Sequence, residues 1–125
     1  MPHRPVHIEF LGMPRLAAAE VATLRRLRGM EGQHSAVTEW SVRLEAAQVD
    51  EVDAPRFRAT VRARIVGGNV LDGQSRESEA LAALRLAFNR LEAELDAEQE
   101  QCRARAANWV RTVARRLAHR HTGDP

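Results

Sequence analysis

Arginine is the residue type with the clearest chemistry in this sequence. All 19 lysine or arginine positions are arginine, a bias that a GC-rich genome also produces. The densest group follows a two-residue period in one short segment: Arg56, Arg58, Arg62 and Arg64. A guanidinium is a permanently charged planar fork that suits phosphate and carboxylate, and four on one face repel one another. Two interpretations stay open, a solvated face paired with Glu39, Glu45 or Glu77, and a surface for RNA phosphates.

A second basic segment lies near the end of the chain. Residues 102–120 carry six arginines and no acid, whereas residues 72–101 carry eight acids against three arginines. The basic segment contains Trp109, which we expect to pack in the core or in a dimer, with the arginines outward. A helix lying on RNA is the alternative, and an anionic membrane is disfavoured by the acidic stretch before it. We expect Cys102 to be a half-buried small apolar residue.

Groups typical of catalysis or metal binding are missing from the pattern. No nucleophile, base and acid occur together, and Gly67-Gly68 lacks the lysine and hydroxyl residue of a phosphate-binding loop. His119 and His121 do not make metal-ligand spacing with Cys102. A lone cysteine cannot form an internal disulfide, and no apolar run approaches the ~20 residues that span a bilayer. We therefore expect a cytoplasmic protein that is not an enzyme, with no cofactor, metal, membrane or small-molecule substrate.

Periodicity predicts the elements that position these side chains. At 125 residues the chain can bury one core without disulfides, and with 4% aromatic residues that core is mainly aliphatic. Alternation predicts strands at Val6–Leu11, Val37–Leu44 and Arg56–Val66, and a fourth at Val70–Ser75 after the turn at Gly67-Gly68-Asn69. Helical spacing predicts one helix over Pro14–Met30 and another from an N-cap at Ser78. The second runs as one helix of about 40 residues or breaks near Glu94–Gln101.

The order is β-α-β-β-β-α, an α+β fold. We expect a two-layer sandwich in which helices cover one face of a four-stranded, mostly antiparallel sheet, with a C-terminal helical extension. The expected division is an α+β domain over residues 1–95 and a basic helical extension with a disordered end over residues 96–125.

Several short segments occur together at a characteristic spacing. They are Arg26-Leu27, Ser41-Val42-Arg43-Leu44-Glu45, Ala59–Ile65 followed by Gly67-Gly68, and Glu79–Leu84 leading to Asn89-Arg90-Leu91. From about Ile8 to Leu95 the chain resembles the hibernation promoting factor and ribosome-associated inhibitor A family. The resemblance implies a factor that docks on rRNA in the decoding channel of the small ribosomal subunit under stress, inhibiting translation or preserving idle ribosomes. Arg26 and Arg90 would stand where the family has lysines that face phosphate.

The expected RNA-binding residues combine this resemblance with the arginine pattern. They are Arg25, Arg26, Arg43, Arg56, Arg58, Arg62, Arg64, Arg90, Arg103, Arg105, Arg111, Arg115 and Arg116. The expected partners are the small ribosomal subunit and its rRNA, and self-association through the C-terminal helix stays open. Because Leu91–Gln101 is acidic where the family is rich in lysine, the alternative is a protein-interaction module that no longer binds the ribosome.

Overall fold

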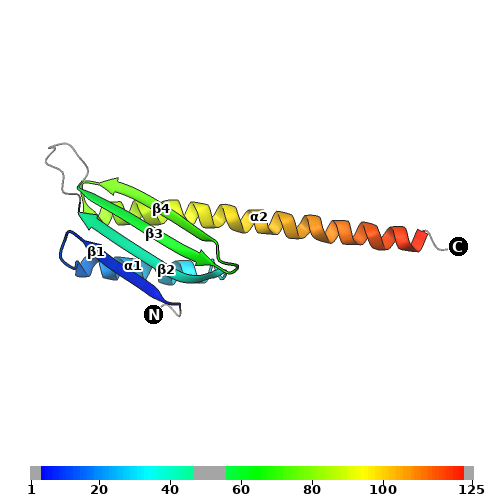
Figure 1. Cartoon of the computed structure of the whole chain (residues 1–125), viewed down its shortest axis with the longest axis horizontal. Coiled ribbons are helices and arrows are strands. Elements are labelled where there is room, and N and C mark those ends of the chain that lie inside the picture. The colour runs from blue at the N-terminus through cyan, green and yellow to red at the C-terminus, as the bar shows by residue number, and fades with distance from the viewer. Residues whose placement is uncertain (1–3, 47–55, 123–125) are drawn as a thin grey trace. The chain divides into compact units, whose positions relative to one another are not determined.

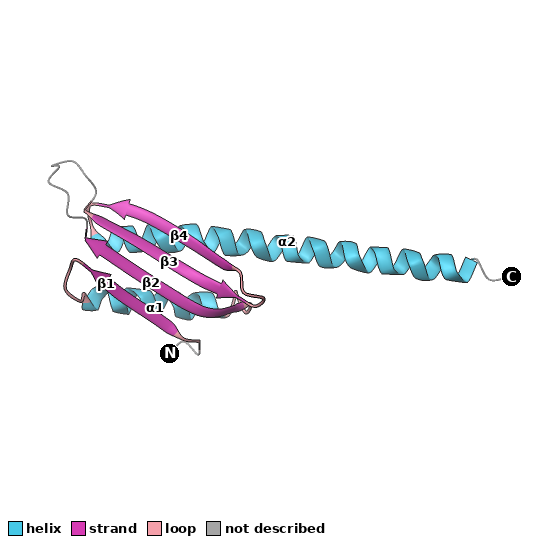
Figure 2. Cartoon of the chain, in the orientation of Figure 1, coloured by secondary structure: helices cyan, strands magenta, loops and turns pink. Residues whose placement is uncertain are grey.

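A four-stranded mixed sheet forms one layer of the protein, and helices cover one of its faces (Figure 1). The structure, a computed structural model, describes residues 4–46 and 56–122. The strands are β1 (Val6–Leu11), β2 (Val37–Ala46), β3 (Phe57–Ile65) and β4 (Val70–Glu77), and the helices are α1 (Ala17–Glu31) and α2 (Ala80–Thr122). Figure 2 shows these elements by type. The strands lie in the order β1-β2-β3-β4, with β1 parallel to β2 and the other pairs antiparallel. The predicted α+β class, element order and sheet are confirmed.

The helices begin later than the sequence pattern predicted. α1 starts at Ala17, because Leu16 is in extended conformation. The helical pattern predicted from Pro14 therefore included Leu16, an apolar residue that lies before the helix. α2 starts at Ala80, and the Ala83 amide donates to the Glu79 carbonyl at 3.0 Å. Glu79, and not Ser78, is therefore the N-cap residue.

α2 continues without a break through the polar stretch from Glu94 to Gln101. Of the two alternatives, one helix or two, the structure therefore has one. Alanine, leucine, glutamate and glutamine are strong helix formers, so this stretch stays helical although it offers few apolar anchors.

Alternate side chains of the two central strands fill the space between the sheet and the helices. From the sheet these include Trp40, Val42, Leu44, Ala59, Val61 and Ala63, and from the helices Leu27, Met30, Phe88, Leu91 and Leu95. Trp40 is fully buried, and Val42 lies opposite Val61 in the strand register. The opposite side chains of the same strands therefore form the outward face of the sheet.

Gly73 lets α2 pack directly on the backbone of β4. Gly73 is buried opposite Val61, and a Cβ atom at this position would lie 2.2 Å from the carbonyl oxygen of Ala87 and 2.5 Å from the amide nitrogen of Leu91. A side chain at position 73 would push the two elements apart. The predicted turn between β3 and β4 is also present, with Gly67 and Gly68 at φ of 100° and 95°.

The chain divides into two compact units, Met1–Leu95 and Asp96–Pro125. The first unit holds the whole core, which ends at Leu95. The described part of the second unit is helical, and between Asp96 and Ala118 only Glu98, Gln99 and Val113 are partly buried. Trp109 and Cys102 are exposed, so a core position for Trp109 and a half-buried position for Cys102 are both wrong, whereas packing of Trp109 in a dimer stays a prediction. A lone helix has no second surface against which to bury them.

Candidate nucleic-acid interface

The outward face of the sheet brings together the arginines that alternate along β3. Arg58, Arg62 and Arg64 share this face with Arg43 of β2, since paired residues of adjacent strands point to the same side. Arg58 lies between Glu45 and Arg76 in the register, and Arg62 between Ser41 and Asp72. Arg56 precedes β3 and is exposed. Arg76 lies opposite Arg58 and extends the basic group onto β4. It was not among the expected site residues, although the two-residue period of β4 places Arg76 on the same face as Asp72.

Acidic side chains are interleaved with these arginines. Glu9 accepts from Arg43 at 3.3 Å, and Glu39 lies 3.9 Å from Arg64 and 3.0 Å from His7. The expectation that Glu39 pairs with this group therefore holds for Arg64. Glu77 lies opposite Phe57 in the register and so belongs to the other face, which excludes it as a partner of the group.

Arg58 and Arg62 make no ion pair within residues 4–46 and 56–122. Arg58 is half-buried, whereas Arg62 is exposed. The sheet face is thus a nearly balanced mixture of charges in which Arg62 is the exposed arginine of β3 that has no ion-pair partner in the described part of the chain.

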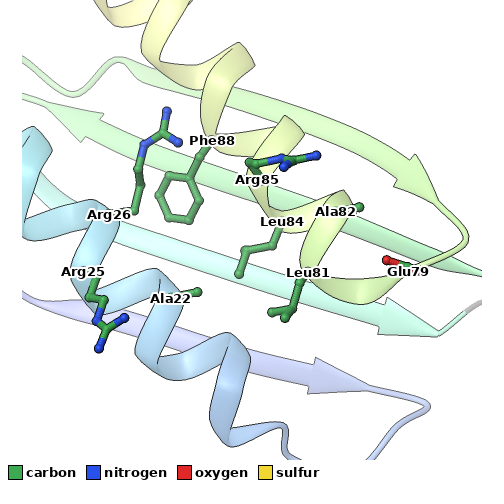
Figure 3. Close-up of a pocket in the computed structure, with 9 residues that line it drawn as sticks. All are labelled: Ala22, Arg25, Arg26, Glu79, Leu81, Ala82, Leu84, Arg85 and Phe88. Atoms are coloured by element: carbon green, nitrogen blue, oxygen red, sulfur yellow. The ribbon is translucent and has the colours of Figure 1, made fainter.

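A groove of about 620 Å³ lies in the helix layer of the first unit. It is lined by Ala22, Arg25, Arg26, Glu79, Leu81, Ala82, Leu84, Arg85 and Phe88 (Figure 3). Arg25 and Arg26 come from α1 and Arg85 from α2, around Leu84 and Phe88. Arg25 and Arg85 are exposed, and neither forms an ion pair with any described residue. The groove therefore combines an apolar floor with the acid Glu79 and with two exposed arginines, Arg25 and Arg85, that form no ion pair with a described residue.

Arg85 was not among the expected RNA-binding residues. It stands three residues before Phe88 and four after Leu81, so the helical period places it at the edge of the apolar side of α2. That spacing could have marked Arg85 as a candidate site residue. It does not reveal the groove, however, because the groove forms only where α1 lies beside α2.

Arg26 and Arg90, the two positions suggested by the family resemblance, already have partners within the first unit. Arg26 donates through Nη2 to Asn89 Oδ1 at 2.8 Å and to Glu92 Oε2 at 2.6 Å, which ties α1 to α2. Its guanidinium also lies 5.8 Å from the centre of the Phe88 ring. Arg90 donates to the carbonyl oxygen of Gln74 on β4. Much of the charge of Arg26 is offset locally, so its contribution to anion binding is reduced.

The remaining expected residues belong to the second unit. Arg103, Arg105, Arg111, Arg115 and Arg116 are all exposed on α2. Arg105 contacts Glu98 Oε1 at 3.3 Å and the Cys102 sulfur at 3.4 Å. The described part of this unit is therefore a basic helix that also presents Trp109.

The described residues contain no cluster of three or more side chains suited to a metal ion. Within the same part of the chain, no helix is both long and apolar enough to span a membrane. What the arrangement offers chemically is anion binding through guanidinium groups, over an apolar floor in the groove and among acids on the sheet.

The solved structures that are similar to this chain include the following two. The first is a ribosomal subunit interface protein from Coxiella burnetii, with a TM-score of 0.64 and 10% identity over 76% of this chain and 97% of that chain. The second is the N-terminal domain of Protein Y from Thermus thermophilus, with a TM-score of 0.57 and 15% identity over 73% of this chain and 94% of that chain. No protein-family model and no curated protein matches the sequence. The likeness confirms the hibernation-factor-like fold that the sequence markers predicted.

Proposed function

We propose that this protein is a cytoplasmic, ribosome-associated factor that binds rRNA of the small subunit. In this proposal it inhibits translation or preserves idle ribosomes under stress, and it does so without catalysis or a cofactor. The observation that carries the proposal is the fold, which matches nearly the whole length of two chains, one described as a ribosomal subunit interface protein. In this mechanism the protein occupies the channel that messenger and transfer RNA would use, and electrostatic attraction between its arginines and rRNA phosphates holds it there.

Three cations of the first unit are assigned phosphate contacts in this proposal. Arg25 and Arg85 flank the groove, and Arg62 is the exposed arginine of β3 that forms no ion pair with a described residue. A guanidinium without a protein partner can offer its whole charge and both edges to phosphate, and each phosphate it neutralises releases a counterion. Arg43, Arg64 and Arg26 are assigned a smaller share because acids already offset them.

The second unit supplies further cations in this proposal. Arg103, Arg111, Arg115 and Arg116 lie on an exposed helix, and none of them forms an ion pair with a described residue. We assign to them sequence-independent contacts with phosphate, which increase retention without adding specificity.

A protein-interaction module on the same fold is the second candidate function. It is favoured by the internal partners of Arg26 and Arg90 and by the acidic residues from Glu92 to Glu100. Acidic side chains near rRNA reduce affinity, so a chain that kept the fold and lost ribosome binding could carry such a stretch.

Sucrose-gradient sedimentation of the tagged protein with cell lysate separates the two candidates. The ribosome proposal predicts that the protein migrates with small subunits at low salt and leaves those fractions as salt rises. With five or more phosphate contacts, log K falls by about 0.7 to 0.9 per contact for each tenfold increase in salt. A protein that stays at the top of the gradient at low salt refutes ribosome association, and recovery there with a protein partner supports the interaction module.

A further inference from the structure

Trp109, Val110 and Leu117, the large exposed apolar side chains in the described part of the second unit, lie in one continuous apolar strip along α2. The strip consists of Cys102, Ala106, Trp109, Val110, Val113 and Leu117. At 3.6 residues per turn these positions fall within a sector about 100° wide. Trp109, Val110 and Leu117 are 68%, 58% and 53% exposed. Side chains of this size do not stay in water on one side of a helix without a cost, so the strip is a surface for a partner.

The spacing of the strip is that of a helix pair. Cys102, Ala106, Trp109 and Val113 are separated by four, three and four residues. These three steps span 11 residues, about 3.7 per step, which is close to the 3.5-residue repeat that keeps one seam facing a second helix in a coiled coil. The arginines Arg111 and Arg115 lie on the side of the helix away from this seam and remain available to solvent or RNA.

The order of charges along the unit identifies the partner and its direction. Asp96, Glu98 and Glu100 come first, and from Arg103 to Ala118 every charged residue is an arginine. A second copy running in the opposite direction places its basic half beside this acidic half. A parallel copy would place the basic halves side by side, where like charges repel.

We infer that residues 98–117 of two copies pair as antiparallel helices, with Trp109 of each copy packed against Ala106 of the other. In this register Cys102 lies opposite Val113, so every layer of the seam combines a larger side chain with a smaller one. A parallel pair would instead stack Trp109 on Trp109 and Ala106 on Ala106, which alternates crowded layers with empty ones. This pairing goes beyond the proposed function and does not depend on it.

One ion pair between the copies follows from the same register. Glu98 and Arg116 are 18 residues apart, which is five full turns, so both lie on the same side of the seam. In the antiparallel pair Glu98 of one copy meets Arg116 of the other. Within its own chain Glu98 uses only Oε1, toward Arg105 and Cys102, and Oε2 has no partner among the described residues.

Disulfide crosslinking tests both the pairing and its direction. The Val113→Cys chain, which keeps Cys102, should form a dimer linked between positions 102 and 113 under mild copper-phenanthroline oxidation. The wild-type chain and the Cys102→Ser/Val113→Cys chain should give little linked product. Mass spectrometry of the linked peptides identifies the bond. Links from 102 to 102 and from 113 to 113 in those two controls would show parallel pairing and overturn the inference, as would a dimer that forms no 102–113 link.

Analytical ultracentrifugation measures the association itself. The full chain should form a dimer in a concentration-dependent way over the micromolar range, because the seam is short. Trp109→Ala should weaken the dimer at least about tenfold, since a buried tryptophan is a typical interface anchor. Asn108→Ala, on the opposite side of the helix, is the matched control and should change nothing. A monomer at every concentration up to several hundred micromolar overturns the inference.

Discussion

Replacing Gly73 with alanine should destabilise the first unit strongly, although the change adds only one methyl group. The added Cβ would lie 2.2 Å from the Ala87 carbonyl oxygen and 2.5 Å from the Leu91 amide nitrogen. Both are backbone atoms of α2 and cannot rotate away, so β4 and α2 must separate. Overpacking of a core costs about 1 to 3 kcal/mol, and we expect about 3 kcal/mol here. For a unit of this size each kcal/mol shifts Tm by roughly 4 to 8 °C, so Tm should fall by roughly 12 to 24 °C.

Gly29→Ala is the matched control, because it adds the same methyl group where no atom beyond the neighbouring backbone of its own helix lies within 4 Å. Gly29 is inside α1, so alanine should raise the unfolding free energy by about 0.5 to 1 kcal/mol. Thermal unfolding followed by Trp40 emission, in a Trp109→Phe background, reports on the buried core. Equal Tm values for Gly73→Ala and the parent chain would refute the close packing of α2 on β4.

Three further predictions follow from the charges and the division of the chain. Changing Arg25 and Arg85 together to glutamine should lower the slope of log K against log salt for rRNA binding by about 1.4 to 1.8, and filter binding over a salt series measures this. Arg26→Met should lower the unfolding free energy measured in urea titrations by about 1 kcal/mol. The change removes the hydrogen bonds to Asn89 and Glu92 but keeps an apolar side chain against Phe88. An unchanged urea midpoint would show that these hydrogen bonds add no stability. Deleting residues 102–125 should leave the cooperative calorimetric transition in place, because the core ends at Leu95, and loss of that transition would place the deleted residues in the core.

The periods of the sequence predicted the fold well because each strand has one buried side. Trp40, Val42 and Leu44 alternate with polar residues, and β3 repeats the pattern, so the sheet could be expected from residues alone. The first residue of each helix was harder to predict. Leu16 fits the helical period of the apolar residues, but it is in extended conformation and precedes α1. The single buried glycine on β4 carried no such signal, because its role depends on the path of α2.

The candidate site was less predictable because charge patterns do not show which partners lie across the fold. The contacts of Arg26 with Asn89 and Glu92 join residues more than 60 positions apart. The groove likewise needs α1 and α2 side by side before Arg25 and Arg85 line the same surface. The core position expected as one alternative for Trp109 was wrong for a related reason, since an apolar strip shows that a surface needs a partner and does not show which one.

Binding of the labelled protein to purified ribosomal subunits tests the central proposal most directly. The account predicts saturable binding to small subunits at low salt, loss of that binding as salt rises, and weaker binding for the Arg25→Gln/Arg85→Gln chain. Arg43→Gln/Arg64→Gln serves as the control, because both arginines already face acids and should affect binding less. Equal, unsaturated binding to small and large subunits, or no binding to small subunits at low salt, would contradict the account.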